Sequence, residues 1–143
     1  MTYCVAVLLA LTLSPQQNPG SDGLVLVINK ASGLTELSSQ EVADLYLGQR
    51  SEIKGVRLRP VDRSDAKRLR KTFMKKTLGM SSSNYAKHWM AKRYRDGDSA
   101  PRKLADAEEV TDFVRAVPGA IGFISAAEAE QMDMKGIVIV ARF

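Results

Sequence analysis

The chain has 143 residues, of which 45% are hydrophobic, and these values are ordinary for one globular domain. Its formal net charge of +5 is unevenly distributed, because residues 50–103 contain 17 of the 21 Lys and Arg residues but only 5 of the 16 acidic residues. The composition excludes an intrachain disulfide, since Cys4 is the only cysteine, and the single histidine, His88, has no histidine or cysteine neighbours that would complete a metal site.

The first 14 residues contain an apolar run, Val5 to Leu13, that is too short to span a bilayer. A run of this length at the N-terminus is typical of a secretory signal peptide, although no Lys or Arg precedes it. The alternative interpretations are a first strand or a misplaced start site. We therefore expect a signal peptide over residues 1–14, a flexible tether over residues 15–23, and a folded domain over residues 24–143 in the periplasm or outside the cell.

The domain begins with two elements that the sequence predicts clearly. Leu24–Asn29 is a continuous apolar run and indicates a strand that is buried on both faces. Ser38 and Glu41 have the spacing of a capping box and predict a helix over residues 39–47, which Gly48 ends. With residues 56–61 as the next strand, this order predicts a β-α-β crossover.

A basic helix is predicted directly after the second strand. Residues 62–65 offer several N-cap side chains, and the spacing of Leu69 and Phe73 indicates a helix over residues 65–78. A strand that turns at once into a helix places free backbone N–H groups beside Arg63 and Lys67. This combination favours the binding of an anion.

The remaining elements alternate between helices and strands. Val110, Phe113, Val114 and Val117 have the spacing of an amphipathic helix, and Asp106 and Glu109 form its capping box. The other predictions are a helix from residues 81–83 to about residue 94, a loop over 96–101, a strand over 120–124, a short helix over 126–132 and a strand over 136–143. The order is that of an α/β domain with a small central sheet flanked by helices, in which ligands collect at the carboxyl ends of strands.

Four segments occur in a fixed order along the chain: residues 27–30 (VINK), residues 37–48 (LSSQEVADLYLG), Arg63 ten residues before Phe73, and residues 117–123 (VPGAIGF). Together they resemble the phosphate-binding proteins of ABC transporters. The last resembles the "pGaIGY" stretch of that family, and residues 44–48 resemble its "dIFlGk" stretch. The resemblance runs from about residue 24 to residue 125 and implies a single lobe of the type II periplasmic-binding-protein fold.

The chain departs from that family in two ways. The family has an Arg followed by Ser-Gly-Thr and then Phe, whereas the Ser-Gly-Thr positions here are Lys67, Arg68 and Leu69. The family also has two lobes that close on the ligand, and this chain has the length of one lobe. The resemblance implies a small anion such as inorganic phosphate as ligand, and a membrane transporter or signalling protein as partner.

The candidate ligand-binding residues form two groups. The first is Arg63, Ser64, Asp65 and Lys67 at the start of the basic helix, where a guanidinium and helix N–H groups suit phosphate or carboxylate oxygens. The alternative is that Arg63 pairs with Asp62 or Asp65 and that Ser64 only caps the helix. The second group, Asn29 and Ser32, follows the first strand, and its alternative is an ordinary loop.

Three classes of function remain open at this point. The first is an anion-binding transport module, and the second is an interaction module of the same fold that has lost ligand binding. The third is a nucleic-acid-binding protein that uses the basic segment 50–103, which has a formal charge of about +12 against about −7 for the rest of the chain. We expect no nucleic-acid partner, because the N-terminus predicts export and aromatic residues are few.

No catalytic triad, metal-ligand spacing or Walker loop is present in the sequence, so we expect neither an enzyme nor a cofactor.

Overall fold

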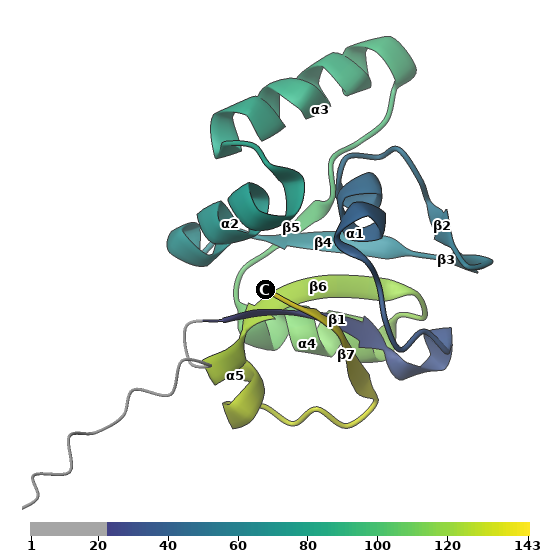
Figure 1. The fold of residues 1–143 in the computed structure, drawn as a ribbon, viewed down its shortest axis with the longest axis vertical. Coiled ribbons are helices and arrows are strands. Elements are labelled where there is room, and N and C mark those ends of the chain that lie inside the picture. Colours follow the sequence, from purple (N-terminus) through teal and green to yellow (C-terminus); the bar gives the residue numbers. More distant parts are fainter. Residues whose placement is uncertain (1–22) are drawn as a thin grey trace, which may run out of the picture.

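The computed structural model describes residues 23–143, in which a five-stranded sheet runs through the centre of the domain (Figure 1). The strand order is β5-β4-β6-β1-β7. The predicted signal peptide, Cys4 and all of the predicted tether except Gly23 lie outside the described residues. The strands of the sheet are β1 (Leu24–Asn29), β4 (Arg59–Arg63), β5 (Arg102–Leu104), β6 (Ala120–Ser125) and β7 (Ile137–Arg142).

The sheet is mixed, with two antiparallel and two parallel pairings. β1 is antiparallel to both β6 and β7, and β4 is parallel to both β5 and β6. The predicted β-α-β crossover is therefore wrong: β6, which comes much later in the chain, lies between β1 and β4, and β1 runs in the opposite direction. A fully apolar strand such as Leu24–Asn29 is buried whichever way it runs, so its composition contains no information on direction.

The strand predicted over residues 56–61 is divided in the structure. β3 (Val56–Arg57) forms a two-stranded hairpin with β2 (Glu52–Ile53), and β4 begins separately at Arg59. β5 was not predicted, because its three residues, Arg102 to Leu104, include two exposed basic side chains. A strand this short does not have enough alternation to be recognised.

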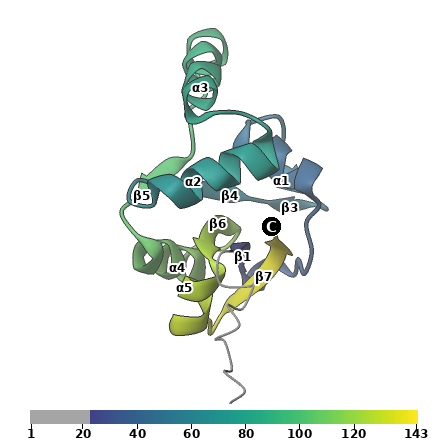
Figure 2. The ribbon, with the colours of Figure 1, turned by 60° about the vertical axis from the view of Figure 1, so that its left-hand side comes forward.

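Helices cover both faces of the sheet. α1 and α2 lie over one face, and α4 lies over the other (Figure 2). Within residues 23–143, no helix combines the length and the apolar character needed to cross a membrane. The helices are α1 (Ser39–Tyr46), α2 (Lys67–Phe73, continued by a π-helical turn, Met74–Leu78), α3 (Ser82–Asp96), α4 (Ala107–Ala116) and α5 (Ala126–Gln131).

The two faces of the sheet have separate hydrophobic cores. In the core beneath α1 and α2, the rings of Phe73 and Phe123 are stacked with their centroids 4.3 Å apart, and Tyr46 packs edge-on against Phe73 at 4.7 Å. In the core beneath α4, Val110 and Val114 are fully buried, as their helical spacing predicted. The apolar face predicted for α4 is thus confirmed, and the buried side chains of α1 and α4 hold these helices on opposite sides of the sheet.

The longest helix, α3, projects from the body of the domain (Figure 1). Its inner side chains contact the C-terminus of α1: Tyr85 Oη and Trp89 Nε1 donate to the carbonyl oxygen of Tyr46, at 3.1 and 3.2 Å. His88 Nε2 lies 2.8 Å from the carbonyl oxygen of Leu47, to which it donates. These contacts satisfy carbonyl groups that have no partner within α1. His88 is half-buried and joins α3 to the end of α1.

Gly119 precedes β6 and is required for two independent reasons. Its φ is +79°, and a Cβ at this position would collide with the backbone oxygen of Arg57. Gly33 has a similar φ of +74° but open space around it.

Gly33→Ala should therefore lower the free energy of unfolding by only about 1 kcal/mol through backbone strain. Gly119→Ala should cost about 2 kcal/mol more, because the backbone must also move.

Urea denaturation of the two variants measures this difference directly. Because both substitutions place alanine in a left-handed backbone conformation, the difference between them isolates the collision with Arg57. Equal losses of stability would contradict the close packing of the turn before β6 against the segment that leads into β4.

Candidate functional site

A pocket lies at the end of the sheet where β4 and β6 finish. Its volume is about 620 Å³, which is within the usual range for small-molecule sites. β4 and β6 are parallel, so Arg63 at the end of β4 and Ser125 at the end of β6 both reach this pocket. The carboxyl ends of parallel strands are where α/β domains commonly bind ligands. The structure therefore has a pocket at the carboxyl ends of strands, where the sequence predicted that ligands collect.

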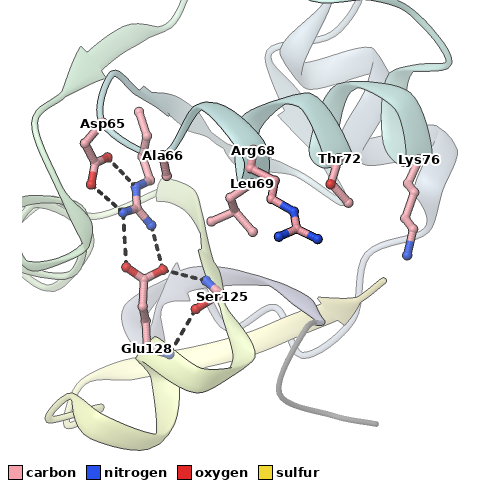
Figure 3. A pocket seen from close by; sticks show the side chains of 9 residues that line it. Asp65, Ala66, Arg68, Leu69, Thr72, Lys76, Ser125 and Glu128 are labelled. Carbon is pink, nitrogen blue, oxygen red and sulfur yellow. Dashed lines mark hydrogen bonds and ion pairs between the residues drawn. The ribbon is translucent and has the colours of Figure 1, made fainter.

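Arg63 forms one wall of this pocket and is engaged by two carboxylates. Its Nε and Nη2 donate to the two oxygens of Asp65 at 3.0 and 2.9 Å. Its Nη1 and Nη2 donate to the two oxygens of Glu128 at 2.8 and 3.1 Å (Figure 3). The side chain of Arg63 is only 2% exposed, so the guanidinium is held between the two acids within the protein.

Glu128 is placed by the first turn of α5. Ser125 and Glu128 form a capping box, in which Ser125 Oγ accepts from the backbone N–H of Glu128 at 3.0 Å. In return, Glu128 Oε1 accepts from the backbone N–H of Ser125 at 2.9 Å and still reaches Arg63. The carboxylate of Glu128 therefore takes part in the cap of α5 and in the ion pair with Arg63 at the same time.

The pairing shifts the pKa of all three groups in the direction that keeps them charged. Burial by itself would lower the pKa of Arg63, but the hydrogen bonds to Asp65 and Glu128 outweigh it and raise this pKa. Hydrogen bonding to Arg63 lowers the pKa of Asp65 from its ordinary 3.8. Burial opposes the ionisation of Glu128, yet the bonds to Arg63 and Ser125 lower its pKa from 4.5.

The adjacent residue in β4, Asp62, has a different partner. Its two oxygens accept from Arg70 Nε and Nη2 at 2.9 to 3.0 Å, and Asp62 Oδ1 also accepts from the backbone N–H of Arg63. Asp62 is 2% exposed and belongs to the core rather than to the pocket. Of the two partners considered for Arg63 from the sequence, the structure selects Asp65 and adds Glu128 from a distant element.

A row of polar side chains on α2 forms the opposite wall. Arg68, Thr72 and Lys76 recur every four residues and lie along the same side of the helix (Figure 3). Neither Arg68 nor Lys76 forms an ion pair with any other residue between 23 and 143. Ala66 and Leu69 also line the pocket and add apolar surface. This wall therefore offers two cations and one hydroxyl beside a small apolar patch.

The structure brings together only part of the predicted site. Arg63 and Asp65 line the pocket, but Lys67 does not. Ser64 does not cap α2, because both its Oγ and its backbone N–H donate to the carbonyl oxygen of Leu104. The first turn of α2 begins at Ala66 without a side-chain cap.

The second predicted group lies at the other end of the sheet. β1 is antiparallel to β6, and Leu24, not Asn29, is paired with Ser125. Asn29 Nδ2 donates to the carbonyl oxygens of Arg115 and Val117 at 3.1 Å each, and its oxygen accepts from Ala31 N. Ser32 Oγ accepts from Leu34 N. Asn29 and Ser32 therefore do not line the pocket of Arg63, and their hydrogen bonds are those of a loop that packs against the end of α4.

The sequence-based prediction missed Glu128 and the row on α2. The spacing of Ser125 and Glu128 is a visible capping box, but its contact with Arg63 spans 65 residues and leaves no local pattern. Arg68 and Lys76 are exposed on the basic helix, and only their four-residue spacing with Thr72 could have identified them as pocket residues. No group of three His, Cys, Asp or Glu side chains suited to a metal ion occurs within residues 23–143.

Comparison with solved structures identifies the fold. An ABC-type phosphate transport receptor from Vibrio cholerae superposes with a TM-score of 0.60, at 21% identity over 83% of this chain. A protein assigned as a phosphate ABC transporter substrate-binding protein from Clostridium perfringens, solved with bound phosphate, gives 0.63 at 18% identity over 83%. PstS from Borrelia burgdorferi gives 0.62 at 14% identity over 84%.

These neighbours are binding proteins or receptors by name, and the likeness extends to only part of them. The chain spans 45%, 44% and 47% of the three structures, which is less than half of each. No protein-family model and no curated protein matches the sequence. At identities below 25%, the comparison establishes the α/β fold, as a fragment of the phosphate-receptor architecture, and leaves the ligand open.

The lowered pKa values at the pocket predict how stability depends on pH. The ionised forms of Asp65 and Glu128 stabilise the fold at neutral pH, and this stabilisation is lost as the pH falls below 4.5 and through the lowered folded-state values. Glu128→Gln should cost about 1–3 kcal/mol at pH 7, since Arg63 stays buried with one partner fewer. The fall in stability below pH 4.5 should then be shallower than in the wild type.

Glu130→Gln is the matched control, since Glu130 is exposed on the same helix and pairs with no residue that the structure describes. Its curve of unfolding free energy against pH should run parallel to that of the wild type and within about 0.5 kcal/mol of it. Denaturant titrations between pH 7 and pH 3 measure all three proteins. A Glu128→Gln curve parallel to the wild type would show that the ion pair with Arg63 does not contribute to stability.

Proposed function

We propose that residues 24–143 form an exported lobe that binds a small anion, phosphate-like in its oxyanion group, in the pocket between α2 and the start of α5. The observation that carries the proposal is the pair of cations on α2, Arg68 and Lys76, which face a 620 Å³ pocket without partners among the described residues. The pocket also lies where ligands bind in α/β folds. The likeness to phosphate receptors supports the same class of ligand.

Two exposed cations with a hydroxyl between them suit an oxyanion. The guanidinium of Arg68 can donate two parallel hydrogen bonds to one anion, and Lys76 adds a compact charge two turns further along α2. Thr72, between them, can donate its hydroxyl proton. The pocket is large enough to hold an organic group attached to the anion, and Ala66 and Leu69 provide apolar surface for it.

Arg63 acts in this proposal as a support for the pocket wall. Its N–H groups are directed at Asp65 and Glu128, so it contributes positive charge behind the wall while Arg68 and Lys76 make the direct contacts. A lobe of this kind would work with a membrane transporter or a signalling protein. The names of the structural neighbours and the apolar N-terminal segment support that partner and an exported location.

An interaction module without a ligand is the second candidate, and the pairing of Arg63 favours it. A guanidinium that is satisfied by two internal carboxylates does not require an external anion for stability. The two candidates differ in one observable: only the first predicts chemical-shift changes around Arg68 and Lys76 on addition of a small anion.

The proposal predicts the effect of removing the two pocket cations. In NMR titrations with phosphate and methanesulfonate, the Nε–H signal of Arg68 should shift with saturation. The double variant Arg68→Gln/Lys76→Gln should bind at least about tenfold more weakly, because two charge-assisted contacts are lost. Thermal stabilisation by the same anions provides an independent measure.

Lys67→Gln/Lys75→Gln is the matched control. It removes the same charge from the same helical segment, but neither residue lines the pocket. Its affinity should stay within about threefold of the wild type, since only screened long-range attraction is lost. Equal losses in the two double variants would indicate diffuse attraction to the basic face and would contradict a defined site.

A further inference from the structure

The guanidinium of Arg63 holds a carboxylate in the way it would hold an anionic ligand. Of its five N–H groups, four point at carboxylate oxygens, two of them from Asp65 and two from Glu128. Asp65 is two residues away and occupies the Nε side of the fork. Glu128 comes from α5 and occupies the outer pair, Nη1 and Nη2, and Arg63 and Glu128 both line the pocket between α2 and α5.

We infer that Glu128 is an internal anion that determines which ligands the pocket accepts: it occupies the outer face of Arg63 and restricts the site to singly charged anions. This inference rests on the proposed function, since it assigns the ligand class of the same pocket. It makes Glu128 a specificity-determining residue, whereas the direct contacts to the ligand stay with Arg68 and Lys76.

The charges that line the pocket support this assignment. Arg63, Arg68 and Lys76 are positive and Asp65 and Glu128 are negative, so the ionised lining residues sum to +1. One negative charge neutralises the site, and a second would remain uncompensated in a partly enclosed pocket. Without Glu128 the sum is +2, which matches a dianion. The preference therefore depends on this one carboxylate.

The geometry of Glu128 makes displacement unfavourable. Its carboxylate is anchored to Arg63 by two hydrogen bonds and to the backbone of Ser125 by a third. A compact anion that competed for Arg63 would have to break all three and would leave the backbone N–H of Ser125 without its carboxylate partner in the capping box. Ligands are therefore expected to stay on the α2 side, against Arg68, Thr72 and Lys76.

The test compares two anions of similar shape and fixed charge, sulfate and methanesulfonate, at constant ionic strength. Glu128→Gln removes the charge but keeps a residue that can complete the capping box with Ser125, so α5 should fold. Glu130→Gln removes the same charge from the exposed side of α5. Glu128→Asp keeps the charge and withdraws the carboxylate from Arg63 by one methylene. NMR titration follows the Nε–H signals of Arg63 and Arg68 separately.

We expect the wild type to bind methanesulfonate in preference to sulfate, with shifts at Arg68 and none at Arg63. In Glu128→Gln, sulfate should bind about tenfold more tightly and methanesulfonate about threefold, because the Coulomb energy of a dianion responds twice as strongly to a lost charge. The Arg63 signal should then shift as well. Glu130→Gln should change neither affinity by more than about twofold, and Glu128→Asp should keep the preference for methanesulfonate.

The outcomes separate this inference from the proposed function. If the wild type binds anions at Arg68 and Glu128→Gln leaves the ratio of the two affinities unchanged, the inference is overturned and the proposed function stands. If only Glu128→Gln binds, the native chain is not an anion receptor, and Glu128 is shown to be what excludes the anion from Arg63. If neither protein binds either anion, both proposals are wrong. A gain in sulfate binding in Glu128→Asp equal to that in Glu128→Gln would overturn the role of the charge.

Discussion

A buried guanidinium needs partners, and the way Arg63 finds them organises this end of the domain. Burying an unpaired charge is far more costly than losing a surface contact, so the chain must deliver carboxylates to Arg63 once β4 is packed into the sheet. Asp65 provides one from the adjacent turn, and Glu128 provides the other from a helix that follows β6. The ion pairs thereby join the β4–α2 turn to the start of α5 and define a wall of the pocket.

The same pairing decides what the pocket can offer to a ligand. Because Arg63 is paired within the protein, the cations that remain for an external group are Arg68 and Lys76. They lie on one face of a helix, and a solvated basic segment without a ligand would have a similar face. A pocket with this charge balance is compatible with the phosphate-receptor fold that its neighbours share, but it differs from a site built around a free guanidinium. The chain also spans less than half of those neighbours, and the pocket described is lined by residues 63–128 of this chain.

Sequence patterns predicted secondary structure reliably where the interactions that determine it join residues close together in the chain. The apolar run of β1, the capping box at Ser38 and the amphipathic spacing of α4 each involve residues within one or two turns, and the structure confirms them. The short strand β5 was not predicted, since its three residues are too few to show an alternation. The π-helical turn after Phe73 lies within residues 65–78, where the spacing of apolar residues predicted one continuous helix.

The sequence alone therefore determined the α/β class, most of the elements, the position of Arg63 at the end of a strand and the excess of cations around it. Only the tertiary structure decided that β1 is antiparallel to β6, which places Asn29 at the far end of the sheet, and that Glu128 meets Arg63 across 65 residues. The physical reason is that strand direction and ion-pair partners depend on which surfaces meet when the chain folds. A local sequence pattern indicates that a residue is buried, but it does not indicate which distant residue packs against it.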